Sequence, residues 1–516
     1  MNESRRKFLR TTACGLTGAA MVASLDRLSL VNAMVHQQQS EVASDYKALV
    51  CIFLSGGSDC NNMVIPYDDY TNPLGGTTNG YDNVRTGSSL AVPKSALGNT
   101  KITPSNTGGV SYAFHPNLSP EANNVGQAKG LLDIWSAGRL AVLCNVGSLV
   151  QPITRANYAA GIGRPYQLFS HSDQVTQQQT SVANTVGQTG WGGRIADKTN
   201  SLNGAVSLPM NISLAGTSLF TTGINSRPLA IAPAPTTLAN LLLLNWNGPS
   251  IANPINVGSS YRTLLGFDQN VTLIKGATDT TNQALTADAA LNQPDPTIPS
   301  PGNPTPFPTT SLGNQLKQIA KLIAIRDATG IKMKRQIFFC NVGGFDTHTN
   351  ETGSDPTNPG GQGTQSGQQG QLLTQLSQVM RAFYDEMVAQ GLSNNVTTFT
   401  LSDFGRTLQP SGSGPGTVGT DHAWGSHAFI MGGAVQGGQF YGSRRPDNTG
   451  LPYGYPALQL GGPDDTTSNR GQWIPTSSVD QYAATLAAWY GLAPADVPAV
   501  FPNLSRFGSS NLGFLG

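Results

Sequence analysis

Three short segments in the last third of the chain place acidic residues and histidines between glycines. They read GGFDTH, SDFGRT and GTDHAWGSH, and together they hold three of the six histidines among the 516 residues. A fourth acidic segment, SGGSDCNN, follows an early hydrophobic run. Carboxylates and imidazoles are typical ligands of divalent metal ions, and glycines permit the sharp turns that bring such ligands together. The four segments therefore predict one metal site assembled from several loops.

Seven residues of these segments are candidate metal ligands. They are Asp59, Asp346, His348, Asp403, Asp421, His422 and His427. The adjacent pair Asp421 and His422 would supply an oxygen and a nitrogen ligand from one turn. Each segment alone also has an ordinary structural explanation, because aspartate caps turns and a histidine can be buried in a core. For Asp59 that explanation is an Asx hydrogen bond in a Gly-Gly turn.

Three further positions could take part in a reaction. In the segment FSHSDQ, Ser170 stands at the start of an expected helix and could accept a transferred phosphoryl or sulfuryl group, with His171 beside it. A serine that only caps the helix would produce the same letters. In SDFGRT, Arg406 can neutralise an anionic group or orient the carboxylate of Asp403. We therefore predict catalytic roles for Ser170, His171 and Arg406.

Hydrophobic runs of strand length alternate along the chain with apolar stripes at helical spacing. The strand-like runs cover residues 48–54, 140–146, 336–342 and 396–401. This alternation predicts an α/β fold with a mostly parallel sheet. In open sheets of this kind, ligands gather outside the carboxyl ends of the strands, and the acidic segments follow such ends.

A single domain is expected over residues 45–510. The stretch 201–310 fits the strand and helix rhythm poorly and contains a run of prolines, so it predicts an insertion or cap with a stiff connector. At the start, Arg5 and Arg6 precede a mildly apolar stretch, which is typical of a twin-arginine signal peptide over residues 1–33. A short basic helix is the alternative. The apolar stretch is too short and too polar for a stable membrane span, so we expect a periplasmic or extracellular protein.

The overall composition excludes one class of function. The net charge is +1 and charged residues make up 11% of the chain, without the clusters of Lys and Arg that nucleic-acid binding requires. The 60 glycines and 33 prolines indicate long irregular connections between the regular elements. The cysteines form no C-x-x-C motif, so none is assigned a metal or redox role.

The ordered motifs resemble those of a known family. SGGSDCNNMVIPY, FSHSDQ, GGFDTH, SDFGRT and GTDHAWGSH together look like the secreted bacterial family of domain of unknown function 1501, from about residue 47 to residue 502. That family is similar in fold to the alkaline phosphatase and sulfatase superfamily. The resemblance implies a three-layer, alkaline-phosphatase-like fold, with helices on both faces of the sheet and long loop insertions.

The same resemblance implies a site with two divalent ions beside a nucleophile. Asp59 and Asp403 would hold one ion, and Asp346, His348 and His422 would hold the other. Asp421 and His427 could complete either coordination sphere, and Ser170 would stand where the superfamily nucleophile begins its helix. The ions considered are Zn, Mn, Mg and Ca.

Two departures from the superfamily pattern matter. The usual Asp-His pair is here Asp403-Phe404, so one ion would lose a nitrogen ligand and favour Mg, Ca or Mn. The sequence contains no C/S-x-P-x-R segment, which argues against a formylglycine sulfatase. The sequence predicts an exported metal-dependent hydrolase of phosphate, sulfate or related esters, acting on small molecules or polysaccharides. The alternative is a non-catalytic secreted binding or surface-assembly protein that retains the fold.

Overall fold

A nine-stranded, mostly parallel sheet forms the centre of the protein. The computed structural model describes residues 42–71, 80–119, 130–238, 263–363 and 367–516. Residues 44–516 form one unit. The predicted signal peptide at 1–33 lies outside the described residues.

The strands follow the order β13-β5-β12-β9-β1-β8-β6-β7, and β14 pairs with β5. Their bounds are β1 Lys47–Leu54, β5 Leu140–Gly147, β6 Asn211–Ser213, β7 Leu229–Ala230, β8 Arg335–Val342, β9 Val396–Ser402, β12 Ser426–Met431, β13 Phe440–Tyr441 and β14 Ser477–Ser478. Strands β8 and β9 flank β1 and run parallel to it, whereas β12 runs antiparallel to both of its neighbours. The three central strands are buried along nearly their whole length, which explains why they read as continuous hydrophobic runs.

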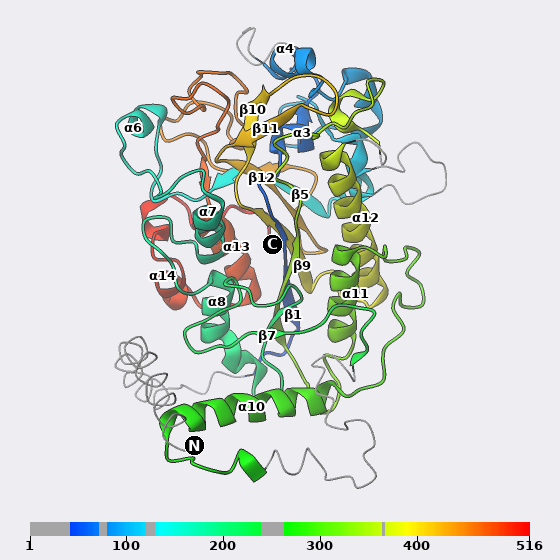
Figure 1. The fold of residues 1–516 in the computed structure, drawn as a ribbon, viewed down its shortest axis with the longest axis vertical. Helices are drawn as coiled ribbons and strands as arrows, with labels where there is room; N and C mark the ends of the chain where they lie inside the picture. Colours follow the sequence, from blue (N-terminus) through cyan, green and yellow to red (C-terminus); the bar gives the residue numbers. More distant parts are fainter. Residues whose placement is uncertain (1–41, 72–79, 120–129, 239–262, 364–366) are drawn as a thin grey trace, which may run out of the picture. The chain divides into compact units, whose positions relative to one another are not determined.

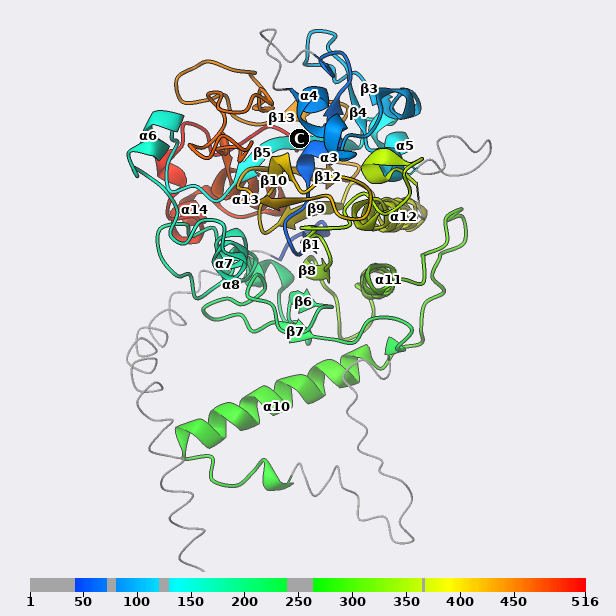
Figure 2. The same ribbon diagram turned by 45° about the horizontal axis from the view of Figure 1, so that its top comes forward.

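Helices cover both faces of this sheet (Figure 1). Helices α5, α11 and α12 lie on one side, and α7, α8, α13 and α14 lie on the other, as Figure 2 also shows. Their bounds are α5 Leu131–Ser136, α7 His171–Thr180, α8 Trp191–Thr199, α11 Ser311–Ala324, α12 Gln368–Ala389, α13 Val479–Tyr490 and α14 Val497–Val500. The predicted α/β fold with three layers is confirmed.

The two helices with the clearest sequence patterns show why these segments are helical. Helix α12 buries the apolar stripe that includes Leu376, Val379 and Phe383, which recurs every three or four residues. Helix α13 begins with a capping box between Ser478 and Gln481, and it ends at a glycine in the left-handed conformation. Burial of one face against the sheet, rather than helix propensity alone, stabilises both helices.

Smaller elements surround the sheet. The remaining strands are β2 Val64–Pro66, β3 Lys101–Ile102 and β4 Tyr112–Phe114, which form one small sheet, and β10 Arg406–Ser411 and β11 Gly419–His422, which form another. The remaining α-helices are α3 Cys60–Met63, α4 Tyr81–Arg85, α6 Arg155–Ala159 and α10 Thr272–Leu291. The 3-10 helices are Thr86–Ser88, Lys94–Ala96, Gly98–Thr100, Pro116–Leu118, Asn200–Asn203, Pro359–Gly361, Pro494–Asp496 and Leu504–Arg506.

The stretch predicted as an insertion, 201–310, is only partly separate from the sheet. Its strand β6 pairs in parallel with β8, and β7 pairs with β6 at the edge of the sheet. Helix α10 follows in the same stretch, and residues 239–262 lie outside the described part. Two short strands of this stretch therefore extend the main sheet. In the described part of the chain, no helix has the length and apolar character needed to cross a membrane.

Candidate metal centre

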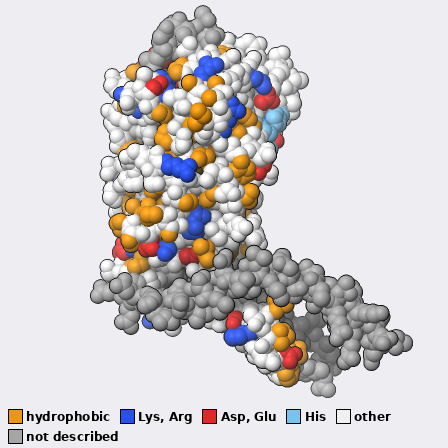
Figure 3. All heavy atoms as spheres, turned by 90° about the vertical axis from the view of Figure 1, so that its left-hand side faces the viewer, with side chains coloured by type: hydrophobic (Ala, Val, Ile, Leu, Met, Phe, Trp, Pro, Cys, Tyr) orange, Lys and Arg blue, Asp and Glu red, His pale blue; other side chains and the backbone are white. Residues whose placement is uncertain are grey.

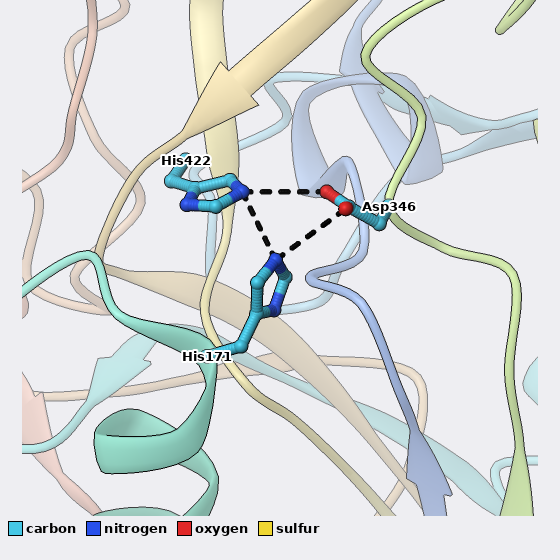
Figure 4. Close-up of side chains that lie close together, drawn as sticks. All are labelled: His171, Asp346 and His422. Carbon is cyan, nitrogen blue, oxygen red and sulfur yellow. Dashed lines mark hydrogen bonds and ion pairs between the residues drawn. The ribbon is translucent and has the colours of Figure 1, made fainter.

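Three imidazole rings and one carboxylate meet where the loop after β8 and the end of β11 approach the start of α7. The Nε2 atom of His422 lies 3.0 Å from Nε2 of His171 and 2.9 Å from Nε2 of His348. It also lies 3.3 Å from Oδ1 of Asp346, whose Oδ2 is 3.5 Å from Nε2 of His171 (Figure 4). Four side chains from three separate segments, at residue 171, residues 346–348 and residue 422, thus lie close to one another. We call these four residues the histidine cluster.

The other nitrogen of each ring is held by a hydrogen-bond acceptor. The Nδ1 atoms of His171, His348 and His422 bond to Asp403 Oδ2 at 2.7 Å, Asp421 Oδ1 at 3.2 Å and the Phe169 carbonyl oxygen at 2.8 Å, respectively. An ionised carboxylate and a carbonyl oxygen only accept hydrogen bonds, so each Nδ1 carries the ring hydrogen. In the neutral rings all three Nε2 atoms are then left with bare lone pairs that face the cluster.

Converging lone pairs repel one another unless a cation lies between them. Burial lowers the pKa of His422, and the neighbouring His171 and Arg406 lower it further, so this ring favours its neutral form. A second acceptor behind each ligating imidazole is the usual arrangement in metal sites, because it fixes the ring and its tautomer. His171, Asp346 and His422 also lie close enough to share one ion. The donor set therefore fits a divalent metal ion.

Asp346 remains charged at this position. Burial favours its neutral form, but the hydrogen bond and charge of Arg406, 2.7 Å away at Nη1, bring the pKa of the carboxyl below its ordinary value. The Arg406 side chain is fully buried and also donates from Nε to the Thr420 hydroxyl. The predicted role of Arg406 in orienting a carboxylate thus has a geometric basis, with Asp346 rather than Asp403 as its partner.

Asp403 and Asp421 lie behind the histidines rather than among the converging atoms. Asp403 is almost completely buried, and its two oxygens accept hydrogen bonds from the Gly56 N–H at 3.1 Å and from His171. Burial raises the pKa of Asp403, although both hydrogen bonds oppose this rise. Both residues were predicted as direct ligands, and the structure instead places each as the partner of a histidine.

Asp59 forms an ion pair with a buried arginine and is not part of the histidine cluster. The buried Arg85 donates to Oδ2 of Asp59 at 2.6 Å and to Oδ1 at 3.0 Å. Its remaining N–H groups donate to Asn62 Oδ1 and to the carbonyls of Thr407 and Leu408, so all five donors are satisfied. Burial opposes the charge on Asp59, but Arg85 lowers its pKa. The Asx-type turn is also present, since Asp59 accepts from the Asn61 N–H.

His427 is likewise placed away from the cluster, in the core on strand β12. Its Nδ1 accepts a hydrogen bond from the Asn145 N–H at 3.1 Å, and its ring stacks on Tyr455 with centroids 5.0 Å apart. Burial lowers the pKa of His427 to about 3, so the ring is neutral. The ordinary explanation of a buried histidine describes this residue, and its predicted role as a ligand is not supported by its position.

Ser170 precedes His171 at the N-terminus of α7. Its hydroxyl donates to Asp173 Oδ2 at 2.6 Å and makes no capping hydrogen bond to the helix backbone. The preceding residue, Phe169, has a positive φ of 73° and presents the carbonyl that accepts from His422. The turn that positions the serine therefore also orients one ring of the histidine cluster.

Glycine allows the loops around the cluster to pack closely. Gly56 has a φ of +116°, and a Cβ atom there would lie 2.3 Å from the backbone nitrogen of Asp346. At Gly57 a Cβ would lie 2.4 Å from the ring of Phe404. These contacts are too short for any side chain, so the loop after β1 can support Asp346 and Asp403 only with glycine.

The cluster is open to solvent on one side. The side chains of His171, Asp346 and His422 are 34%, 45% and 25% exposed, respectively. Histidine atoms are visible at the surface beside basic and acidic side chains in Figure 3. A small molecule can therefore reach the converging atoms.

The sequence patterns missed two arginines near these residues. Arg85 lies 26 residues after Asp59, and Arg470 binds Asp421 Oδ2 at 2.6 Å from 49 residues further along the chain. Neither arginine belongs to one of the acidic segments. Their only sequence signal is a charged residue in a chain with few charges.

Comparisons with known proteins give one family and several distant structures. A family model described as "Protein of unknown function (DUF1501)" matches residues 46–450. No curated protein sequence matches the chain.

Three similar solved structures share 9 or 10% of residues with the chain. A candidate sulfatase from Bacteroides thetaiotaomicron VPI-5482 has a TM-score of 0.31 at 9% identity, covering 89% of this chain and 75% of its own. A 2-O GAG sulfatase has a TM-score of 0.30 at 10% identity, with the same coverage of 89% and 75%. A protein bound to k-i-k-neocarrahexaose, Ps i-CgsB, has a TM-score of 0.30 at 9% identity, covering 89% and 77%. Likeness at this level says nothing of activity.

Proposed function

The chain belongs to the DUF1501 family, and we propose that it is an exported hydrolase of phosphate, sulfate or related esters that uses one divalent metal ion. The observation that carries this proposal is the convergence of three Nε2 atoms on Asp346, with an acceptor behind each ring. Export rests on the twin-arginine pattern of the first 33 residues.

The proposed ion is Zn²⁺. In a tetrahedral zinc site with bonds of about 2.0–2.1 Å, neighbouring ligand atoms are separated by roughly 3.3 Å. Among His171, Asp346 and His422 the corresponding separations are 3.0, 3.3 and 3.5 Å, whereas His348 contacts His422 from outside this group. Two nitrogens and one oxygen, with a fourth position open to water or substrate, suit zinc better than Mg or Ca, which prefer oxygen ligands. This donor set replaces the oxygen-rich site expected around Asp403.

A single ion is proposed because the residues expected to hold a second one are already occupied. Both oxygens of Asp59 are bonded to the guanidinium of Arg85, and both oxygens of Asp403 accept hydrogen bonds from the protein. Arg85 therefore supplies a permanent positive charge where the superfamily resemblance implied a metal ion.

The protein residues have separate tasks in the proposed reaction. A bound metal ion would polarise the ester and stabilise the negative charge that develops as the bond breaks. His171, Asp346 and His422 would hold the ion, and Asp403 and the Phe169 carbonyl orient the two rings. We propose Ser170 as the nucleophile, since its hydroxyl already donates to Asp173, which could accept the proton. The serine oxygen would bond to the phosphorus or sulfur as the bond to the leaving alcohol oxygen breaks, and the alcohol would take up a proton. Water would then release the phosphate or sulfate and restore the serine.

Metal analysis of the purified mature protein tests the proposal, together with a panel of phosphate and sulfate esters. We expect one zinc ion per chain, its loss in Asp346→Ala, and hydrolysis of at least one ester class. A metal-free protein, or one whose metal content is unchanged by Asp346→Ala, would defeat the hydrolase proposal. Metal binding without turnover would favour the alternative, a binding or surface-assembly protein.

The role of the serine has its own test. Ser170→Ala should abolish turnover while the metal content stays the same, because Ser170 holds no part of the ligand set. Full residual activity would remove this residue from the mechanism and leave the metal site intact.

A further inference from the structure

A buried carboxylate organises the loop that follows the histidine cluster in the chain. Asp465 is fully buried, and its Oδ2 accepts from the N–H groups of Gly461 and Gly471, both at 2.9 Å. Its Oδ1 accepts from the Gln472 N–H at 2.9 Å. One carboxylate therefore ties the two ends of this loop together, which fixes the residues between them.

The same loop is attached to the candidate metal centre. Backbone hydrogen bonds join Leu408 N to Gly471 O at 3.2 Å and Gln409 N to Arg470 O at 3.0 Å. The Gln472 side chain donates to the His422 carbonyl at 2.7 Å. The backbone of Arg470 is thus held against strand β10, next to a ring of the cluster.

This attachment presents the guanidinium of Arg470 at the opening of the site. Its Nη2 bonds Asp421 Oδ2 at 2.6 Å, and its Nε donates to the side-chain oxygen of Gln409 at 3.2 Å. The side chain is 36% exposed, and within the described residues its Nη1 has no hydrogen-bond partner. Asp421 contacts His348, so only one residue separates the guanidinium from the cluster.

The other arginine of the site cannot play this part. Arg406 is fully buried, and its guanidinium is bonded to Asp346, Thr420 and the Gly56 carbonyl. The predicted binding of an anionic group by Arg406 therefore has no geometric support. Arg470 lies beside the cluster, and within the described residues its Nη1 is free to donate to a ligand.

The charge balance of the site depends on the bound ion. Four carboxylates, on Asp173, Asp346, Asp403 and Asp421, face two guanidiniums, on Arg406 and Arg470, which leaves two negative charges when the imidazoles are neutral. A divalent ion would cancel these charges, so the ion and the guanidinium of Arg470 would be the positive groups that face an anionic ligand at the opening.

We propose that Arg470 binds the tetrahedral oxyanion of the substrate, the sulfate or phosphate group of the ester, next to the metal ion. This proposal rests on the proposed function, because the metal site defines where the ester lies. Arginine is suited to this task since its planar fork donates two parallel hydrogen bonds to an oxyanion. The loop anchored by Asp465 holds that fork in place before the ligand arrives.

Equilibrium binding of inorganic sulfate and inorganic phosphate to the full metal-loaded chain tests this proposal without requiring turnover. In Arg470→Gln we expect the dissociation constant of the preferred anion to rise about 10- to 100-fold, with unchanged metal content. Arg470→Lys should recover part of the affinity. Arg444→Gln, at an exposed arginine that bonds only within its own loop, is the matched control and should bind as the wild type does.

A second variant separates direct binding from an effect through Asp421. If Arg470 acts only by holding Asp421, then Asp421→Asn should weaken anion binding as much as Arg470→Gln does, and the proposal is wrong. If Arg470 contacts the anion, Asp421→Asn, measured with the metal in excess and its metal content verified, should bind the anion equally or more tightly, since a competing carboxylate charge is lost.

The outcomes also distinguish this proposal from the proposed function. Equal anion affinity in wild type and Arg470→Gln, or no binding of either anion by the wild type, would overturn the role of Arg470 even if esters are hydrolysed. Weaker binding in Arg470→Gln without any ester turnover would support the anion site while the hydrolase proposal fails. The anion that binds more tightly identifies the ester class.

Discussion

The buried pair of Asp59 and Arg85 and the open histidine cluster meet the same requirement in different ways. Each gathers electron-rich atoms around one point near the carboxyl ends of the central strands. At Asp59 the chain supplies the cation itself, and both side chains are fully buried. At the cluster three lone pairs face one another, and the residues are 25 to 45% exposed. Of these two sites, the cluster is therefore the one where the proposed metal ion could enter from solvent.

Removing the internal cation should have the largest effect. Arg85→Met leaves the buried Asp59 charge without its counter-ion and removes the donors to two backbone carbonyls, so we expect a loss of about 3–5 kcal/mol in the free energy of unfolding. Urea denaturation monitored by circular dichroism measures this. Lys275→Met, which breaks an exposed ion pair with Asp279, is the control and should change stability by less than about 0.5 kcal/mol. Equal effects from both variants would contradict the structural role of Arg85.

Removing a central ligand should affect the metal rather than the fold. The ring of His422 contacts both other rings, so His422→Ala should lower metal affinity by more than about 100-fold, as measured by competition with a chelator. His115→Gln changes a buried histidine bonded to Asn117, outside the cluster, and should retain the metal. Unchanged metal affinity in His422→Ala would mean that the rings do not bind the ion.

Changing an orienting partner should have a smaller effect of the same kind. Asp403→Asn keeps the shape of the residue behind His171 but removes the negative charge that fixes the ring, so we expect metal affinity to fall about 10- to 100-fold. One ion per chain should still bind when the metal is in excess. A complete loss of metal would instead show that Asp403 is a direct ligand, as the sequence motif suggested.

The smallest effect is expected at Asp480, a buried carboxylate with no ion-pair partner among the described residues. Burial raises the pKa of Asp480 to about 7, and its Oδ1 has no hydrogen-bond partner in the described structure. Between its ordinary value of 3.8 and about 7, the folded state binds more protons than the unfolded state, so stability falls as the pH rises through this window. Asp480→Asn should remove this decline, so the variant should gain stability relative to the wild type as the pH rises from about 4 to about 8.

Denaturation curves at several pH values measure this difference. Parallel pH profiles for the wild type and Asp480→Asn would contradict the raised pKa. The corresponding Asp59 carboxyl has a lowered pKa because Arg85 is bonded to it. A comparison of the two carboxylates therefore shows directly what the internal guanidinium contributes.

Much of the fold could be predicted because buried parallel strands leave a clear hydrophobic signal. The predicted runs at 48–54, 140–146, 336–342 and 396–401 match strands β1, β5, β8 and β9 to within one residue at each end. The weak point was the stretch 201–310, where β6 and β7 have three and two residues and leave no comparable pattern. Short edge strands are defined by their partners rather than by their own sequence.

The candidate site was less predictable, because spacing along the chain does not show which way a side chain points. The segments around Asp346, His348 and His422 do meet, together with His171 from a segment assigned to catalysis. His427 lies away from the cluster because strand β12 directs its ring into the core. Asp59 lies outside the cluster because it is bonded to Arg85, and no local sequence motif predicts this contact.

Gly56 lies under Asp346 and accepts no substituent, although it has no group that could bind an ion or a substrate. We therefore expect position 56 to tolerate as few substitutions as the histidines of the cluster do. Exposed residues at the opening can be exchanged, whereas a side chain at position 56 would push apart the loops that follow β1 and β8. The need for a residue without a Cβ atom at position 56 therefore limits the range of substrates that the site can come to accept.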